Sequence, residues 1–246
     1  MLLGSLALAF VALAGPEEKK NPVIETPPPY DWTGFYIGVN GGYAWDSGVE
    51  VRDLDMLNVG PPVQSFSFDA DGGVGGIQTG YNWQAIELWH DPIWLVLGVE
   101  GDVGYLGLYG KALQPGSPAP GTFAKIINGV YSTARVRVGL ARDRWLFYVT
   151  GGYFGSNYER EIRDNQICAC GFKLGGGEDE DWESGWTAGG GVEWAFRDHW
   201  SLRVEYLYYD IGDRTVNARI IQTGNFRFGF DEDDGNIFRA GLNFKF

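Results

Sequence analysis

Two runs of acidic side chains are the densest chemical groups in this chain of 246 residues. The runs consist of Glu178, Asp179, Glu180 and Asp181, and of Asp231, Glu232, Asp233 and Asp234. Clustered carboxylates suit Ca²⁺ or Mg²⁺, and a pair of them can act as acid and base in a hydrolysis. Neither run has EF-hand spacing, and charge runs commonly form a solvated surface. We therefore favour solvated surface loops for both runs, keep divalent-cation binding as the less favoured alternative, and predict no catalytic residue and no cofactor.

Thiol and imidazole groups are few. Cys168 and Cys170 form a Cys-Ala-Cys unit, which suits a short-range disulfide, a soft-metal site or a loop pair without chemistry. Structural zinc normally needs four ligands, and nothing near the cysteines supplies the other two. His90 and His199 lie elsewhere in the sequence. We favour the loop pair without chemistry.

A third set of ionisable residues recurs at alternate positions within apolar segments. These residues are Glu100, Asp102, Arg135, Arg137, Glu193, Arg203, Glu205, Arg239 and Lys245. Alternate residues of a β-strand share one face, so each segment has an ionic face opposite an apolar face. Isolated buried charges are costly, and opposite charges on one enclosed face should therefore pair. The spacing predicts an ion-pair network, with a proton or ion path as the less favoured alternative.

Eight segments with a two-residue period must position these side chains. They cover residues 32–45, 72–84, 93–108, 129–141, 145–158, 184–196, 200–212 and 236–246. Short links join the second and third, fourth and fifth, and sixth and seventh segments, whereas links of roughly 20 residues or more join the others, as in bacterial outer-membrane barrels. The sequence therefore predicts an all-β fold, an eight-stranded antiparallel up-and-down transmembrane β-barrel.

The aromatic residues indicate which face meets lipid. A soluble carrier with eight strands would keep its apolar face inside, whereas a membrane barrel turns it outward. Trp83, Trp145 and Trp194 lie next to the short links, and Tyr105 and Tyr208 lie near the long ones. Trp200 also borders a short link. Two bands of such rings are typical of membrane interfaces. We therefore expect the ionic face to line a narrow lumen filled by side chains.

The remaining organisation follows from composition. Residues 1–14 end in Ala-Leu-Ala after an apolar stretch without a basic start, and we interpret them as a signal peptide with a truncated n-region. Residues 15–31 are proline-rich and predict a periplasmic linker, and residues 32–246 form the barrel. An even number of strands places both termini in the periplasm. The formal net charge of −13 argues against nucleic acid as a partner.

Several short segments resemble the small outer-membrane surface-antigen or porin-like β-barrel proteins of alphaproteobacteria, which are related to OmpA-type eight-stranded barrels. The segments are Asp31–Gly38, Gly80–Gln84, Gly98–Asp102, Ala134–Gly139, Tyr148–Gly152, Gly185–Glu193 and Leu202–Tyr206. The resemblance implies a location in the outer membrane of a Gram-negative cell. The C-terminal pattern also looks like an outer-membrane assembly signal, and the resemblance implies that the barrel-assembly machinery reads it. The pattern consists of Arg239, Gly241, Phe244 and Phe246.

These observations predict a structural or surface-interaction protein with a plugged polar lumen and acidic extracellular loops. The alternative is a small porin-like channel for ions or polar solutes. A hydrolase at the outer rim is disfavoured, because His90 and His199 both fall in short links on the periplasmic side. The expected partners are membrane lipid, lipopolysaccharide, the barrel-assembly machinery, and a host or surface ligand.

Overall fold

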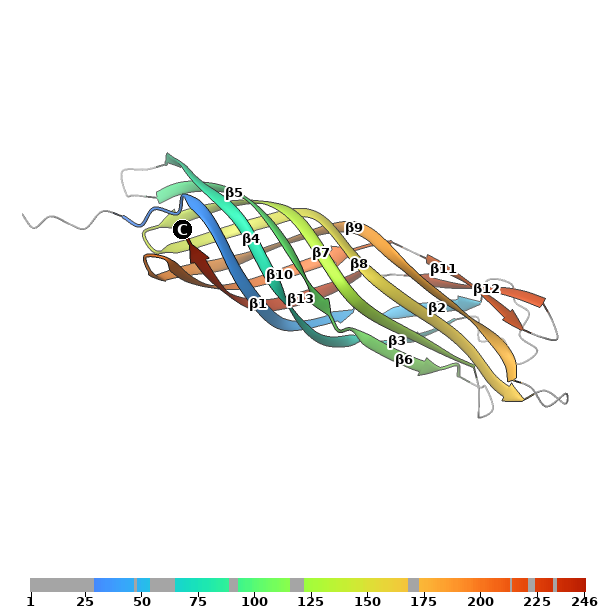
Figure 1. The fold of residues 1–246 in the computed structure, drawn as a ribbon. Helices are drawn as coiled ribbons and strands as arrows, with labels where there is room; N and C mark the ends of the chain where they lie inside the picture. Colours follow the sequence, from blue (N-terminus) through green and yellow to red (C-terminus); the bar gives the residue numbers. More distant parts are fainter. Residues whose placement is uncertain are drawn as a thin grey trace, which may run out of the picture.

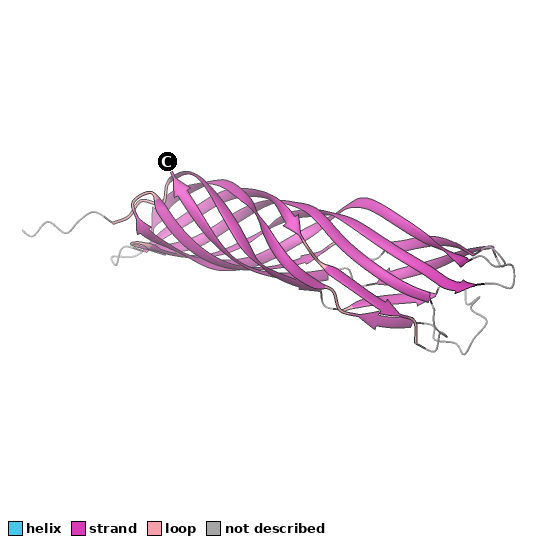
Figure 2. Ribbon diagram, turned by 60° about the horizontal axis from the view of Figure 1, so that its bottom comes forward, coloured by secondary structure: helices cyan, strands magenta, loops and turns pink. Residues whose placement is uncertain are grey.

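The computed structural model describes residues 29–46, 48–53, 65–88, 93–115, 122–167, 173–212, 214–220, 224–231 and 234–246. Within these residues every regular element is a β-strand (Figures 1 and 2). In the same part of the chain, no helix has the length and apolar character needed to cross a membrane.

Eight long strands form an antiparallel ring. They are β1 (Gly34–Asp46), β4 (Asp71–Glu87), β5 (Ile93–Leu106), β7 (Thr122–Arg142), β8 (Trp145–Ile167), β9 (Lys173–Arg197), β10 (Trp200–Asp210) and β13 (Asp234–Lys245). Each pairs with the next, β10 pairs with both β9 and β13, and β13 pairs with β1. A ring leaves no free strand edge, which is what lipid requires of a spanning sheet. The predicted fold class is confirmed.

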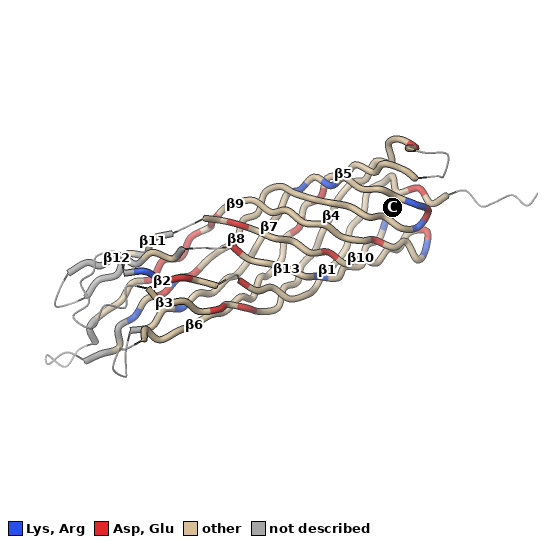
Figure 3. The backbone as a smooth tube through the Cα atoms, turned by 180° about the vertical axis from the view of Figure 1, so that it is seen from behind, with Lys and Arg blue, Asp and Glu red and all other residues tan. Residues whose placement is uncertain are grey.

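The two faces of each ring strand differ in polarity. On β10, Trp200, Leu202 and Val204 point outward and are 39–47% exposed, whereas Arg203 and Glu205 point inward and are 1% exposed. Other large apolar side chains form the same outward belt on the neighbouring strands. Figure 3 shows charged residues in the middle of the barrel as well as at its ends. The ionic face therefore lines the interior, as predicted.

The outward belt ends in aromatic side chains on both sides. Trp83, Trp145, Trp194 and Trp200 are 39–55% exposed at the end with the short turns. Tyr105 and Trp186 are 58% and 50% exposed at the opposite end. From Trp200 to Tyr208 the strand extends about 27 Å, or roughly 20 Å along the barrel axis at the usual tilt. The belt is therefore close to the apolar band of about 25 Å that is usual for outer-membrane barrels.

The barrel continues beyond the second aromatic band as a long extension (Figures 1 and 2). Strands β7, β8 and β9 run well past the predicted segments 129–141, 145–158 and 184–196. Five further strands lie in segments that we expected to be loops: β2 (Val49–Asp53), β3 (Ser65–Phe68), β6 (Tyr109–Leu113), β11 (Arg214–Ile220) and β12 (Gly224–Asp231). Strand β6 pairs with β7. Beyond β9 the sheet continues by pairing in the order β11, β12, β2 and β3. Pairing satisfies backbone groups that a bare loop would leave to water.

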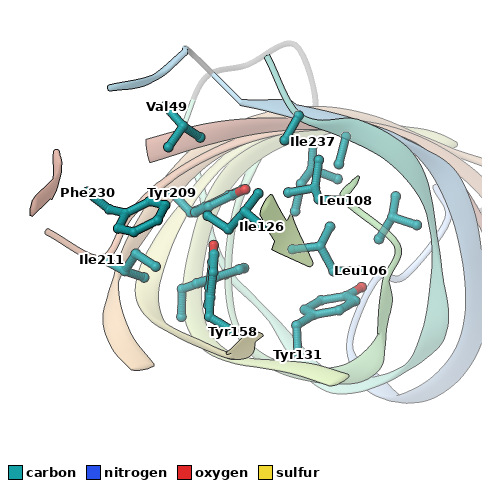
Figure 4. Close-up of a cluster of buried hydrophobic side chains, with 14 of the residues drawn as sticks. Val49, Leu106, Leu108, Ile126, Tyr131, Tyr158, Tyr209, Ile211, Phe230 and Ile237 are labelled. Atoms are coloured by element: carbon teal, nitrogen blue, oxygen red, sulfur yellow. The ribbon is translucent and has the colours of Figure 1, made fainter. Parts of the chain in front are cut away.

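The interior of the extension is mainly apolar, with a buried ion pair between Arg160 and Glu183, unlike the ionic middle of the barrel. On β10 the inward column changes from Arg203 and Glu205 to Leu207 and Tyr209, all buried. A cluster including Leu106, Leu108, Ile126, Tyr131, Tyr158, Phe230 and Ile237 fills this end (Figure 4). The rings of Phe154 and Tyr209 stack with their centroids 4.3 Å apart. The extension therefore has a hydrophobic core of its own.

Candidate functional site

Four arginines and four carboxylates meet in the middle of the barrel. They are Glu100 and Asp102 on β5, Arg135 and Arg137 on β7, Glu193 on β9, Arg203 and Glu205 on β10, and Arg239 on β13. Strand pairing places some partners side by side, such as Glu100 opposite Arg135 and Glu205 opposite Arg239. Their side chains are 0–3% exposed. The site therefore has no formal net charge, which is what a buried ionic group needs to be tolerated.

Ion pairs cross the lumen as well as linking neighbouring strands. Arg239 on β13 reaches Asp102 on β5 at 3.0 Å and Glu205 on β10 at 2.6 Å. Arg135 lies 2.8 Å from Asp102 and 3.2 Å from Glu205. Arg203 donates a short hydrogen bond to Glu100 on the opposite wall. These cross-lumen contacts join the strands into one connected unit.

A second pair extends the network towards the short turns. Arg137 lies 2.8 Å from Glu193, and its guanidinium carbon lies 4.0 Å from the centroid of the Tyr148 ring. Ser201 donates a hydrogen bond of 2.5 Å to Glu193. The planar guanidinium of Arg137 donates to Glu193 and to the Tyr36 hydroxyl and stacks on an aromatic ring at the same time, so lysine would not be equivalent here.

Neutral polar groups extend the network. Gln78 accepts hydrogen bonds of 2.8 Å from Asn40 and 2.6 Å from Arg203. The Tyr36 hydroxyl donates to Glu100 at 2.5 Å, and the Tyr148 hydroxyl donates to Glu205 at 2.9 Å. These groups form further hydrogen bonds with the carboxylate oxygens and guanidinium N–H groups of the ion pairs. Sequence reasoning missed them, because it collected only acidic and basic side chains for the inward face and left out neutral polar residues at inward positions.

Inward glycines provide the space for the long side chains. A Cβ atom added to Gly98 would lie 2.8 Å from Cγ of Arg137 and 2.7 Å from Oδ1 of Asn82. Gly98 stands directly opposite Arg137 in the β5–β7 pairing. The absence of a side chain at this position therefore makes room for the arginine.

Two apolar clusters enclose the network along the barrel axis. The cluster of Figure 4 lies on the side of the extension. A smaller cluster of Trp32, Val96, Ala141, Leu146, Tyr148 and Ala195 lies on the side of the short turns. Trp32 is 2% exposed, and its indole N–H donates to the carbonyl oxygen of Asp143 at 3.0 Å. The ion pairs are thus separated from water at both ends by packed apolar side chains.

Lys245, which we predicted in this network, lies outside it. Its Nζ donates to the carbonyl oxygen of Asp31 and lies 4.3 Å from the centroid of the Tyr30 ring. The inward column of β13 reaches the mouth of the barrel at this residue, and the segment before β1 folds beneath it. Burial raises the pKa of Tyr30 to about 12. The mouth is therefore covered by Tyr30 and Trp32 rather than by an ion pair.

A solvent-exposed ion pair lies at the edge of the same mouth. Arg144 reaches Asp198 at 2.8 Å, and the hydrogen bond from Arg144 lowers the pKa of the Asp198 carboxyl. His199, the described one of the two histidines, has Nδ1 2.9 Å from the carbonyl oxygen of Lys245. This turn joins β9 to β10, as predicted.

Comparison with known proteins identifies the family. A family model described as outer membrane protein beta-barrel domain matches residues 5–246. The chain belongs to this family. It is 31% identical over 262 aligned positions to the 31 kDa outer-membrane immunogenic protein of Brucella melitensis, covering 100% of this chain and 99% of that protein. The predicted resemblance and the outer-membrane location are confirmed.

Two further matches from the same comparison are more distant. The chain is 28% identical to the 22 kDa outer membrane protein of Rhizobium leguminosarum, covering 89% of this chain and 80% of that protein. The solved structure of OprG from Pseudomonas aeruginosa matches with a TM-score of 0.47 and 13% identity, covering 87% of this chain and 96% of OprG.

The acidic run at 178–181 is not a loop cluster in this family member. Residues Glu178 to Asp181 lie within β9, and successive residues of a strand point to opposite faces. Glu178 and Glu180 therefore point outward, whereas Asp179 and Asp181 point inward. No group of three or more potential metal ligands occurs among the described residues. The structure therefore separates the carboxylates of this run and does not gather them into a metal-ligand cluster.

Other candidate residues lie partly or wholly outside the described residues. Of the second acidic run, Asp231 ends β12 and Asp234 begins β13, whereas Glu232 and Asp233 lie outside the described residues, as do Cys168, Cys170, His90 and residues 1–28. In the C-terminal pattern, Arg239 is 1% exposed in the network and Phe246 is 73% exposed. Gly241 lies beneath Arg203, since its added Cβ would approach Cγ of that residue to 3.2 Å.

One buried ion pair in the extension was not predicted. Arg160 on β8 donates two hydrogen bonds, of 2.7 and 2.8 Å, to the carboxylate of Glu183 on β9. Both side chains are 1–3% exposed. The only available signal was their inward position, and we assigned residues beyond 158 and before 184 to a loop.

Proposed function

We propose that this outer-membrane protein is a non-conducting barrel that anchors a stiff β-extension at the cell surface, with both termini in the periplasm. The observation that carries the proposal is the buried, charge-balanced network between two apolar clusters. Each of its eight charged side chains has a partner of opposite sign within the network, and the network occupies the width of a narrow eight-stranded barrel.

An ion that crossed this barrel would have to displace existing ion pairs. Glu100 contacts Arg135 and Arg203, and Arg137 lies 3.6 Å from it. A passing ion would lose its hydration shell before it reached these groups, because apolar side chains lie above and below them. These costs support a closed lumen over the alternative of a small porin-like channel.

Planar-bilayer recording tests the proposal. Purified protein is compared with a general porin in the same lipid and salt, after its folded state is verified by heat-dependent migration on a gel. We expect the porin to give steady conductance steps and this protein to give none. Reproducible open steps from folded protein would support the channel alternative.

The proposed orientation rests on the short turns and on the residues that cover the mouth near Tyr30. The extension then projects on the extracellular side. The Brucella relative carries the word immunogenic in its name, which fits a surface-exposed extension. An epitope tag placed after Leu113, next to a described turn, should be accessible to antibody on intact cells. A tag at the C-terminus should become accessible only after the outer membrane is permeabilised.

The partners that we propose follow from this placement. Lipopolysaccharide surrounds the outer aromatic band, and a host or surface ligand would meet the extension. The barrel-assembly machinery would read the last strand through Phe244 and Phe246. We propose no enzymatic role, because the described carboxylates of the extension are split between two faces or engaged with basic partners such as Lys125 and Arg163.

A further inference from the structure

An apolar groove lies on the outward wall of the barrel over β4, β5, β7 and β8. Small residues form its floor: Thr79, Gly101, Ala134 and Gly151. Strand pairing places Thr79 next to Gly101, and Gly101 next to Ala134. The groove is a shallow, open hollow with a volume of about 640 Å³.

A second hollow adjoins the first one towards the short turns. It has a volume of about 430 Å³ and shares Tyr81 and Val99 with the first. Its other lining residues include Trp83 and Leu97. The two hollows together run from the aromatic band beside the short turns to the middle of the belt.

Large side chains border the floor. Phe35, Val99 and Val136 are 57–65% exposed, and the rings of Phe35 and Tyr81 pack edge to face with centroids 4.7 Å apart. The one hydroxyl on the floor is already engaged, since Thr79 Oγ1 donates to the carbonyl oxygen of Tyr36 at 3.0 Å. The floor therefore offers van der Waals contact and no unengaged side-chain hydroxyl, so it suits an apolar occupant.

We propose that this groove holds one acyl chain of a phospholipid from the periplasmic leaflet. The groove is continuous with the lipid-facing belt and opens beside Trp83, where the headgroups of that leaflet begin. The assignment of the leaflet rests on the proposed orientation of the termini. A flexible chain can follow a narrow curved floor, whereas the convex wall of a second barrel would touch Phe35, Val99 and Val136 before it reached that floor.

Two substitutions fill the groove without disturbing the barrel wall. A Cβ atom at Gly101 would lie 3.5 Å from its nearest neighbour, the carbonyl oxygen of Thr133, which is an ordinary contact. Gly101→Leu therefore places its bulk outward, and Ala134→Leu extends an existing side chain. Gly41→Leu is the matched control, because it is an outward glycine of β1, outside the groove, with its nearest neighbour at 3.8 Å.

Native mass spectrometry tests the proposal on full-length protein extracted from outer membranes in a mild detergent. We expect the unmodified protein and Gly41→Leu to retain one phospholipid per chain, and Gly101→Leu and Ala134→Leu to lose it. Phosphatidylglycerol with a spin label midway along one chain should show an immobilised component with the first two proteins only.

Three results would overturn the proposal. Equal phospholipid retention by all four folded proteins would show that the groove is not the binding site. Retention of lipopolysaccharide in place of phospholipid would refute the periplasmic leaflet. A dimer that dissociates in Gly101→Leu would identify a second copy as the occupant. None of these results depends on conductance, so the closed-lumen proposal is tested separately.

Discussion

Replacement of Arg239 by methionine should destabilise the folded barrel strongly. Its guanidinium donates to Glu205 at 2.8 Å, to Asp102 at 3.0 and 3.2 Å, and to the Tyr131 hydroxyl at 3.1 Å. The side chain is 0% exposed. Arg239→Met removes all of these contacts and leaves the network with one excess negative charge.

The magnitude follows from two opposing contributions. A carboxylate about 3 Å from a guanidinium attracts it by about 5 kcal/mol at an effective dielectric constant of 20, and Arg239 has two such partners. The variant also avoids the cost of burying the guanidinium, so the net effect is smaller than the sum. Breaking a buried pair from one side typically costs about 3–5 kcal/mol, and we expect Arg239→Met to fall in this range.

Equilibrium urea unfolding in phospholipid vesicles, followed by tryptophan emission from both directions, measures this cost. Arg163→Met is the surface control, because Arg163 is 53% exposed on the outside of the extension, and its loss should cost less than about 1 kcal/mol. The double variant Arg239→Met/Glu205→Gln restores charge balance and should be more stable than Arg239→Met alone. An Arg239→Met cost below about 1 kcal/mol, or a double variant less stable than the single one, would contradict the argument from charge balance.

Three other predictions concern the lumen, the mouth and assembly. Gly98→Ala should cost about 1–3 kcal/mol through overpacking against Arg137, whereas Gly101→Ala, which points outward, should be nearly neutral in the same urea assay. Tyr30 should ionise with a midpoint about 2 units above free tyrosine, near pH 12; the phenolate absorbance of the wild type minus Tyr30→Phe measures it. Deletion of Phe246 should lower the outer-membrane yield, measured by membrane fractionation, if the machinery reads the last strand.

The sign of the Tyr30 effect is defined by the direction of the shift. A raised pKa favours the neutral phenol in the folded state, so the contribution of Tyr30 is complete below pH 10 and is lost as the pH rises towards 12. A midpoint near pH 10 in the difference titration would show that the ring is not buried. For the glycine pair, equal losses at Gly98 and Gly101 would refute the assignment of their faces.

The ring strands and most of the network could be predicted, because a two-residue period reports face directly. Arg203 and Glu205 stand two positions apart among apolar residues, and the structure places both in the lumen. The prediction for Lys245 was wrong, because alternation shows which face of a strand a residue lies on but not how deep in the barrel it lies. At the mouth, the same face meets Asp31 and Tyr30 instead of the network.

The extension could not be predicted for two physical reasons. The outer part of β9 contains Gly175, Gly176 and Gly177 followed by the acidic run, a composition that favours a loop when it is considered alone. Pairing with β8 along its length holds it as a strand instead. The apolar residues inside the extension were not predicted, because we assigned polar residues to the inward face and apolar residues to the outward face. On β10 the inward face is ionic at Glu205 and becomes apolar at Leu207.

The change of polarity along β8 determines how deep the molecule sits in the membrane. On the outer face of β8, the large side chain of Tyr153 is followed by Gly155, Asn157 and Glu159, while on the inner face Phe154 begins the stacked rings. If the barrel moved into the membrane by a few residues, carboxylates such as that of Glu159 would enter the hydrocarbon. If it moved out, the apolar belt would be exposed to water. Lipid opposes movement into the membrane, and water opposes movement out of it. The side chains on the outer face of the strand therefore set the height of the extension above the lipid.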